Sequence, residues 1–377
     1  MGEDGNGLTP MDDAKLKLGK RKSIAAGIPA VLSSAAHSVK KMGVTKSIKT
    51  LTMVNQKEGF DCPGCAWPDP VHRSSFEFCE NGAKAVADEA MSAKVNPKFF
   101  AQYSVNELAQ NSDYWLNSQG RIAEPMYLAT GASHYQPITW DEAFAKIADK
   151  LNSLSSPNRA VFYTSGRTSN EAAFLYQAFV RMYGTNNLPD CSNMCHESSG
   201  KALVSTIGIG KGTVTLDDFN HAETILVIGQ NPGTNHPRML TALRDAKQNG
   251  ATIIHINPLP ETGLERFKHP QDYMKLNFSS TKLSDYHIAV KIGGDAALLQ
   301  GLNKLIIEST KLDKAFIDNK TKHFTDYEES LKDINWARIV SDSGVEKSTI
   351  EHIASILVKS KSIISCWAMG LTQHKNG

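Results

Sequence analysis

The residues best suited to chemistry lie in the segment 187–200, which reads NLPDCSNMCHESSG. It contains two cysteines, Cys191 and Cys195, and His196 directly follows the second one. A thiolate is a nucleophile and a soft metal ligand, and a neighbouring imidazole can accept a proton near neutral pH. The sequence therefore predicts that Cys195 and His196 form the reactive centre.

A second group of cysteines begins with Cys62 and Cys65, in C-x-x-C spacing, and continues with Cys79. The proline and glycine between the first two suit a tight turn, which lets both sulfurs face one metal ion or cluster. This spacing satisfies iron–sulfur or zinc chemistry, and plain structural thiols are the third alternative. A redox dithiol would require a helix after the pair, and the sequence WPDP at residues 67–70 opposes one.

Length and composition limit the class of protein. The chain has 377 residues, which favours two or three domains. Its formal net charge is +2 and its pI about 8.1, so no nucleic-acid-binding surface is indicated. The chain has six cysteines, all but Cys366 in groups, which favours metal or redox use in a reducing compartment over a disulfide scaffold. Without a membrane-spanning apolar run or a signal-peptide pattern, we expect the cytoplasm.

The elements that must position these residues include a β–α–β unit. Residues 224–229 and 251–257 read as buried strands joined by a helix over 237–248. Such a unit forms a parallel sheet, and the loops at the carboxyl ends of its strands bind ligands. The pattern also predicts helices over 24–42, 139–151, 170–183, 198–207, 295–307 and 345–358, and strands over 159–164, 288–292 and 362–367.

The loop after the first of these strands, at residues 230–236, offers polar groups to a ligand. Its residues Asn231, Gly233, Thr234 and His236 supply neutral donors and backbone amides that suit a phosphate. Ordinary turns use the same residue types, so spacing alone is compatible with a phosphate-binding loop and with a plain turn. The glycine-rich segment 208–213 does not fit the P-loop pattern, and nucleotide hydrolysis is not predicted.

Taken together, these segments resemble the molybdopterin oxidoreductases of the DMSO reductase superfamily, in the branch similar to formate dehydrogenase H (FdhF/YdeP type). The resemblance extends from about Cys62 to the last residue and rests on motifs in a fixed order. They are CPGC, ITWDEAF, SGRTSNEA, YGTNNLPDCSNMCHESS, IGQNPGTNHPRM, GATIIHINP, IGGDAALL and CWAMGLTQH.

The resemblance implies an α/β fold like that of formate dehydrogenase and DMSO reductase. A small iron–sulfur subdomain would be followed by doubly wound parallel-sheet domains. The expected parts are an N-terminal extension (1–50), whose helix we expect to pack on the protein's own surface, an iron–sulfur cluster subdomain (51–135), the start of a pterin-binding α/β domain (136–190), and a Rossmann-like pterin-dinucleotide domain that carries the metal ligand and is truncated (191–377).

For the site, the resemblance implies a molybdenum-bis(molybdopterin guanine dinucleotide) cofactor. Cys195 matches the molybdenum ligand, His196 matches the histidine that handles the proton, and Cys191 matches a position that is not a ligand. At position 257 the family often has an acidic residue, where this chain has a neutral one. The positions that would grip the cofactor are Arg167, Asn170, Asn231, Gly233, Thr234, His236, Asn257 and Gln373.

The resemblance also implies a [4Fe–4S] cluster held by Cys62, Cys65 and Cys79. The chain departs from the family at the third ligand position, where Asp69 replaces a cysteine. We therefore expect three cysteines with Asp69 or His72 as the fourth ligand.

The implied activity is formate dehydrogenase-like oxidation of a small molecule such as formate, with electrons passing to the cluster and then to an electron-carrier protein. No nucleic-acid partner and no membrane span are expected. Family members are roughly twice as long as this chain, so the alternative is a truncated, catalytically inactive fragment that acts as a binding or interaction protein. A zinc protein built on Cys62, Cys65 and Cys79 is the third reading.

Overall fold

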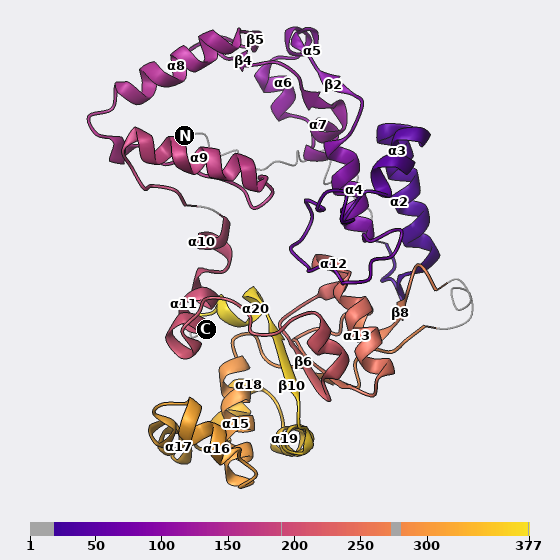
Figure 1. The fold of residues 1–377 in the computed structure, drawn as a ribbon, viewed down its shortest axis with the longest axis vertical. Helices are drawn as coiled ribbons and strands as arrows, with labels where there is room; N and C mark the ends of the chain where they lie inside the picture. The colour runs from indigo at the N-terminus through magenta and orange to yellow at the C-terminus, as the bar shows by residue number, and fades with distance from the viewer. Residues whose placement is uncertain (1–18, 190, 273–279, 376) are drawn as a thin grey trace. The chain divides into compact units, whose positions relative to one another are not determined.

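The computed structural model of the chain describes residues 19–189, 191–272, 280–375 and 377. Contacts within the chain divide it into two compact units, whose elements are labelled in Figure 1. Unit 1 comprises the residues up to 21, then 32–64 and 75–191. Unit 2 comprises residues 22–31, 65–74 and 192–377. The four-part division expected from the sequence stays a prediction.

Unit 2 is built on a four-stranded parallel sheet with the strand order β10-β6-β7-β9. In the register of the sheet, Ile364 lies beside Ile225, Ile225 beside Ile253, and Ile256 beside Ile288. The long apolar runs therefore pair with one another across the sheet. The strands are β6 (Thr224–Ile228), β7 (Thr252–Ile256), β9 (Tyr286–Ile288) and β10 (Ile363–Trp367).

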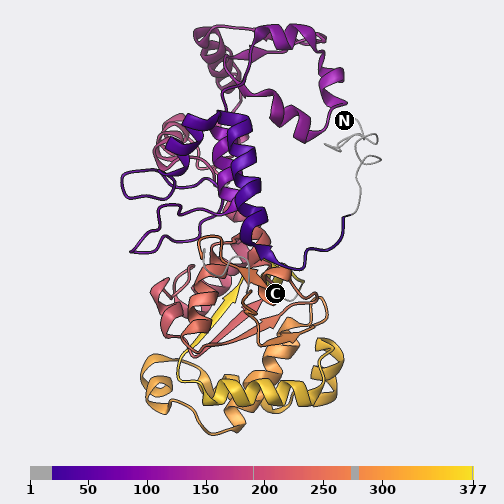
Figure 2. The ribbon, with the colours of Figure 1, turned by 90° about the vertical axis from the view of Figure 1, so that its right-hand side faces the viewer.

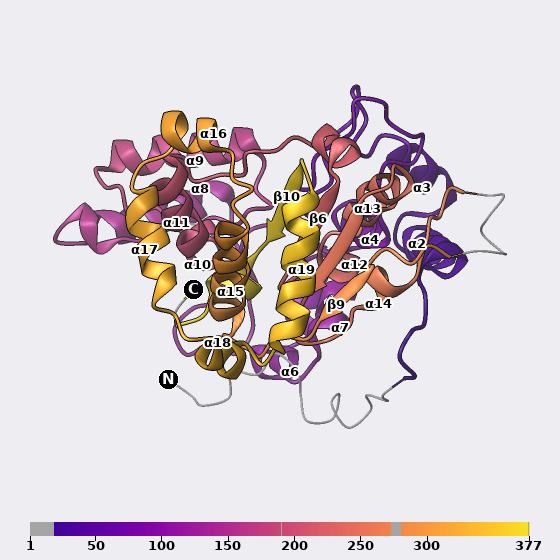
Figure 3. The same ribbon diagram turned by 90° about the horizontal axis from the view of Figure 1, so that it is seen from below.

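Helices cover both faces of this sheet, so the predicted doubly wound α/β fold is confirmed. Ile225, Val227 and Ile253 face a buried cluster with α13 (Met239–Gln248) and α14 (Thr262–Glu265). Alternate residues of the same strands face α15 (Asp295–Glu308), α18 (Trp336–Ser343) and α19 (Lys347–Lys359). Figure 2 shows the yellow helix along the lower side of the strands, and Figure 3 shows α15 and α19 in front of them.

The remaining elements of unit 2 surround this sheet. They are β1 (Ala25–Ala26), α10 (Cys191–Cys195, which starts at the end of unit 1), α11 (Glu197–Ile207), the 3-10 helix η2 (Asp217–His221), α12 (Pro232–Asn235), β8 (Phe267–Lys268), α16 (Lys314–Lys320), α17 (Phe324–Lys332) and α20 (Met369–Thr372).

The described part of unit 1 is mainly helical and contains two short strand pairs, β2–β3 and β4–β5, whose strands are two residues long. Its elements are α2 (Gly27–Met42, which starts in unit 2), α3 (Val44–Leu51), α4 (Glu80–Glu89), β2 (Lys94–Val95), α5 (Pro97–Gln102), α6 (Val105–Ala109), α7 (Asp113–Gln119), β3 (Arg121–Ile122), β4 (Met126–Tyr127), β5 (Gln136–Pro137), α8 (Trp140–Asn152), the 3-10 helix η1 (Pro157–Arg159) and α9 (Asn170–Tyr183).

The strand predicted over residues 159–164 is wrong. Phe162 is buried against Tyr176 and Tyr183 of α9, but its neighbours Val161 and Tyr163 are exposed. A strand requires a ladder of hydrogen bonds to a second strand. Here residues 160–163 run as an irregular loop, in which the Phe162 backbone amide donates to the carbonyl of Asn187, and Thr164 alone forms a single β-bridge.

Helices α8 and α9 expose large apolar side chains. Trp140, Phe144 and Ile147 recur at helical spacing along α8, and each is more than half exposed. Phe174 and Leu175 on α9 are also more than half exposed. Such a face is unusual for a helix that has its full set of neighbours.

Within the part of the chain that the structure describes, no helix is both long and apolar enough to cross a membrane.

Candidate active site

Cys195 lies where two helices of unit 2 meet. It is the last residue of α10, and His196 precedes α11 at the position before its first turn. The Cys195 side chain is half-buried and its sulfur lies 3.0 Å from the sulfur of Met369, whereas His196 is exposed. The structure thus keeps the predicted pair at the surface of the unit, with the thiol beside a second soft sulfur. The side chain of Cys191 lies outside the described residues.

The segment after β10 holds the backbone around Cys195. The side-chain amide of Gln373 donates to the carbonyl oxygen of Cys195 at 2.7 Å and to that of Met194 at 3.1 Å. Beside it, the hydroxyl groups of Ser199 and Thr372 are 2.7 Å apart. Gln373, predicted as a cofactor contact, is therefore brought to the predicted reactive centre.

A close approach of two glycines fixes this segment against the end of β6. A Cβ added to Gly370 would lie 2.2 Å from the carbonyl oxygen of Gly229, and Gly229 itself has φ +60°. Neither position can take a side chain without moving the backbone. The carboxyl ends of β6 and β10 thus face the loop that carries Gln373.

The loops after β6 and β7 form a polar cluster in unit 2. The side chain of Asn231 accepts from the backbone amide of Thr234 at 3.2 Å and donates to Glu261 at 2.7 Å. The side chain of Asn257 donates to the other carboxylate oxygen of Glu261 at 3.3 Å and to the carbonyl of Leu259 at 2.7 Å. The structure therefore unites Asn231, Thr234 and Asn257 around Glu261.

Glu261 was missed by the sequence reasoning. The available signal was an acidic residue shortly after the second strand of the β–α–β unit, the usual place for a nucleotide-binding carboxylate. Gly233 belongs to the same loop pair, because a Cβ there would lie 3.3 Å from the Cα of Gly263. The two glycines let the two loops pack directly against each other.

His236 and Asp69 are engaged with a segment of unit 2 that follows Cys65. The ring of His236 stacks on Trp67, with centroids 6.0 Å apart and an interplanar angle of 16°. Burial lowers the pKa of His236, so the ring is neutral near pH 7. Asp69 forms ion pairs with Arg238 at 2.8 Å and with Arg73 at 3.5 Å. A carboxylate bound by two guanidinium groups is a poor free donor for iron.

Arg167 and Asn170 lie in unit 1, at the start of α9. Both side chains are exposed, and the preceding Ser169 caps the helix by accepting from the amide of Ala172 at 3.3 Å. Because they belong to the other unit, they are not placed relative to Cys195. Their predicted cofactor contacts stay predictions.

Two of the predicted iron ligands meet at the start of α4 in unit 1. The sulfur of Cys79 accepts from the amide of Gly82 at 3.4 Å, and the sulfur of Cys62 accepts from the amide of Gly64 at 3.3 Å. A Cβ on Gly82 would lie 2.8 Å from the Cys62 sulfur and 3.8 Å from that of Cys79. Gly82 has no side chain to fill the space beside the two sulfurs, and backbone amides donate to both of them. Such donors and the start of a helix stabilise the thiolate form of cysteine, which fits an iron–sulfur or zinc site.

Cys65, the second residue of the C-x-x-C pair, falls in unit 2 and is half-buried. Among the described residues the structure assembles no group of three or more His, Cys, Asp or Glu side chains that could hold a metal ion. The full ligand set of the cluster therefore stays a prediction.

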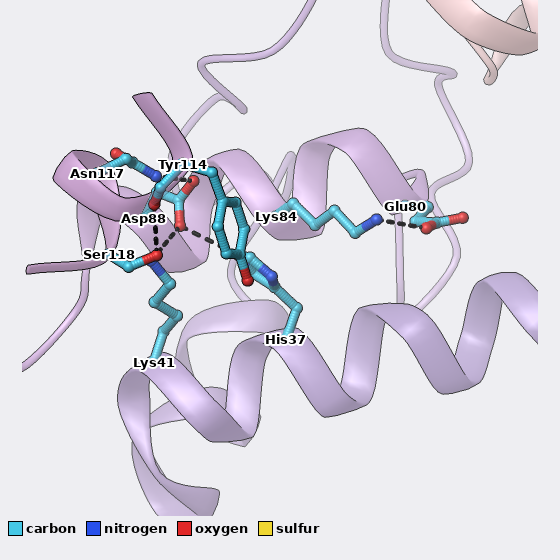
Figure 4. Close-up of polar contacts among 8 residues, drawn as sticks. All are labelled: His37, Lys41, Glu80, Lys84, Asp88, Tyr114, Asn117 and Ser118. Atoms are coloured by element: carbon cyan, nitrogen blue, oxygen red, sulfur yellow. Dashed lines mark hydrogen bonds and ion pairs between the residues drawn. The ribbon is translucent and has the colours of Figure 1, made fainter. Parts of the chain in front are cut away.

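A polar clamp joins α2 to α4, the helix that Cys79 precedes, as Figure 4 shows. His37 and Lys41 on α2 lie 3.1 and 3.3 Å from the same oxygen of Asp88 on α4, and Asn117 on α7 donates to its other oxygen at 3.1 Å. One turn earlier, Ser33 donates to Glu80 at 2.7 Å. The expected packing of the N-terminal helix on the protein is thus confirmed within unit 1.

Comparisons with known proteins agree with this arrangement. The family model for molybdopterin oxidoreductase matches residues 121–377. The chain is 50% identical to an uncharacterized oxidoreductase of Mycobacterium tuberculosis, over 97% of this chain and 48% of that protein. It is 45% identical to the protein YdeP of Escherichia coli, over 96% of this chain and 49% of YdeP. The chain thus spans about half the length of these curated relatives.

A more distant relative supports the same family, and a solved structure shares the fold. Formate dehydrogenase H of Escherichia coli is 29% identical, over 68% of this chain and 34% of that protein. The solved structure of acetylene hydratase from Pelobacter acetylenicus shares the fold with a TM-score of 0.53 and 20% identity, over 64% of this chain and 31% of that one. The chain therefore belongs to the molybdopterin oxidoreductase family, in the branch that includes YdeP and formate dehydrogenase H.

Proposed function

We propose that this oxidoreductase uses a molybdenum-bis(molybdopterin guanine dinucleotide) cofactor to oxidise a small molecule of the formate type. The observation that carries the proposal is the anchoring of Cys195 by Gln373. The resemblance matches Cys195 to the metal ligand and Gln373 to a pterin contact, and the hydrogen bond brings these two positions together. When bound, such a cofactor supplies two-electron redox chemistry to the substrate carbon.

The chain's own residues would have distinct tasks. Cys195 would ligate molybdenum through its thiolate, which is a soft donor suited to that metal. His196, exposed beside it, would accept the proton released from the substrate. Gln373 would keep the Cys195 backbone in place. Asn231 and Thr234, with the other predicted cofactor contacts, would hold the nucleotide ends of the pterins.

We further propose that Cys62, Cys65 and Cys79 hold a [4Fe–4S] cluster that passes electrons to an electron-carrier protein. The thiol cradle around Gly82 supports this reading. The ion pairs of Asp69 argue that the fourth ligand comes from elsewhere, such as His72. The free thiols of Cys65, Cys195 and Cys366 suit the reducing conditions of the cytoplasm.

The test is the metal content of the chain after anaerobic purification from a host that makes the cofactor. We expect stoichiometric molybdenum and iron in the wild type. Cys195→Ala should lose molybdenum and formate-dependent dye reduction but keep iron. The matched control Cys366→Ala removes a half-buried thiol on β10 and should keep both metals. Absence of molybdenum from the wild type would contradict the proposal, and zinc in place of iron would favour the zinc reading.

The exposed apolar face on α8 and α9 favours a second candidate function, a binding protein without turnover. Trp140, Phe144 and Phe174 are each more than half exposed, which suits contact with another polypeptide. This candidate predicts a stable complex with a partner and no bound molybdenum. The metal assay above therefore separates the two functions.

A further inference from the structure

The ends of β6 and β7 carry a carboxylate whose role the family resemblance does not explain. Glu261 follows β7 by five positions and accepts hydrogen bonds on both oxygens, from Asn231 at 2.7 Å and from Asn257 at 3.3 Å. Its side chain is only half-buried. The carboxylate is thus fixed in one place by two amides and still open to solvent on one side.

Glu261 has hydrogen-bonding capacity left. A carboxylate offers about four acceptor positions, and the two amides use one on each oxygen. A further donor group can therefore bind without displacing either amide. In nucleotide-binding parallel α/β folds, an acidic residue after the second strand accepts hydrogen bonds from the ribose hydroxyl groups of the bound nucleotide.

The position that normally supplies this carboxylate is neutral in the chain. Asn257 is the first residue after β7, and its side-chain amide is turned to Glu261 and to the carbonyl of Leu259. An amide in this place cannot provide the charge-assisted bond that a ribose hydroxyl gains from a carboxylate. Glu261 lies within hydrogen-bond distance of Asn257 and restores the negative charge.

The backbone around the cluster is packed closely enough to make the position of Glu261 definite. A Cβ on Gly233 would lie 3.3 Å from the Cα of Gly263, and one on Gly263 would lie 3.2 Å from the Cα of Gly233, so a side chain at either position would crowd the other loop. Just after β6 and near the end of β7, the Oε1 of Gln230 and the Nε2 of His255 are buried and have no hydrogen-bond partner among the described residues. Buried polar atoms of this kind are normally satisfied by water or a ligand.

We propose that Glu261 binds the ribose hydroxyl groups of one guanosine end of the cofactor, in place of an acidic residue at position 257. This inference rests on the proposed function, because the guanosine belongs to the pterin dinucleotide cofactor named there. The rigid amide pair orients the carboxylate, and the ribose diol donates to the two acceptor positions that the amides leave open.

The test measures nucleotide binding by the full chain without metal, using isothermal titration calorimetry. The probes are GDP and 2′,3′-dideoxy-GDP, which lacks the diol. We expect Glu261→Gln to weaken GDP binding by about tenfold to a hundredfold, the range for one hydrogen bond to a charged group. The same variant should bind dideoxy-GDP as the wild type does. Glu265→Gln, an exposed residue one turn further along α14, is the matched control and should leave both affinities unchanged.

The outcomes separate the ribose contact from a merely structural role. If Glu261 only ties Asn231 to Asn257, its loss would weaken GDP and dideoxy-GDP equally, and the proposal is overturned. It is overturned as well if GDP binds both proteins equally, or if the wild type binds no GDP. A wild type that binds GDP through Glu261 but never carries molybdenum would instead overturn the proposed function alone.

Discussion

The side-chain amide of Gln373 donates a hydrogen bond of 2.7 Å to the backbone carbonyl of Cys195, a residue 178 positions earlier in the chain. The bond joins the loop after the last strand of the sheet to the end of α10. It acts on the backbone of the cysteine, whereas the sulfur contacts the sulfur of Met369. Gln373 is thus placed to set the position of the thiol while another group binds it.

Gln373→Leu should loosen the turn that carries Cys195. The substitution leaves the carbonyl groups of Met194 and Cys195 without their donor, at a cost of about 1 kcal/mol for each hydrogen bond. Hydrogen exchange over residues 194–200 should accelerate, while exchange in β6 stays unchanged. Gln248→Leu, an exposed change at the end of α13, is the control. Unchanged protection at 194–200 would remove Gln373 from this role.

Gly82→Ala should disturb the thiol pair at the start of α4. The new Cβ would lie 2.8 Å from the Cys62 sulfur, so that sulfur has to move. We expect a destabilisation of about 1–3 kcal/mol, typical of overpacking, and a clear loss of bound iron. Gly212→Ala, at a position with open space around it, should change neither quantity. Full iron content in the Gly82 variant would show that the cluster does not use Cys62 in this position.

Asp88→Asn should weaken the attachment of α2 at neutral pH. Burial raises the pKa of Asp88, but the hydrogen bonds from His37, Asn117 and Lys41 outweigh it and hold the pKa below the ordinary value. A carboxyl group with a lowered folded pKa stabilises the fold above its unfolded pKa and loses that contribution as the pH falls through the folded pKa.

The variant should therefore lose about 1 kcal/mol of protection in residues 32–42 at pH 7, measured by hydrogen exchange. Once the pH falls below the lowered pKa of the folded Asp88 carboxyl group, the two proteins should converge, because the wild-type group is then protonated too. Asp149→Asn on the exposed surface of α8 is the control. A difference that persists unchanged at low pH would contradict a charge-based clamp.

His255 should make the stability of unit 2 sensitive to mild acid. Burial and the nearby His287 lower the pKa of His255 to about 4, while an unfolded histidine titrates near 6.5. The unfolded chain therefore takes up a proton first as the pH falls, and the free energy of unfolding decreases between pH 6.5 and 4. The loss amounts to roughly 3 kcal/mol at the lower end.

His255→Gln should flatten this dependence in urea titrations followed by tryptophan fluorescence. The exposed His221→Gln variant should retain the wild-type slope. Parallel curves for His255→Gln and the wild type would show that the ring is not neutral in the fold.

The parts of the fold that depend on residues close together in the sequence could be predicted from it. The capping box of Thr139 and Glu142 forms as expected, because both partners lie in one helical turn. The β6–α13–β7 unit also follows from its own apolar periodicity. The segment 159–164 has the same apolar character, but strand formation needs a partner from elsewhere, and the pattern alone cannot show whether one is present.

In the candidate site, too, single residues could be predicted from local motifs, but contacts between distant segments could not. Cys195 and Asn231 were found from motifs, since their residue types indicate chemistry on their own. The contact between Asn231 and Glu261 spans 30 residues, and that between Gln373 and Cys195 spans 178. Such contacts depend on how strands and loops are brought together in space, and no local pattern encodes them.

The pairing of β6 with β10 has a consequence for the synthesis of the protein. Residues 224–228 emerge from the ribosome long before residues 363–367, yet β10 is their parallel partner on one side. Until then, one edge of an apolar strand stays unpaired in the growing chain. Non-local parallel pairing is slow, and open strand edges attract other chains. We therefore expect β6 to be the segment of the nascent protein that chaperones bind.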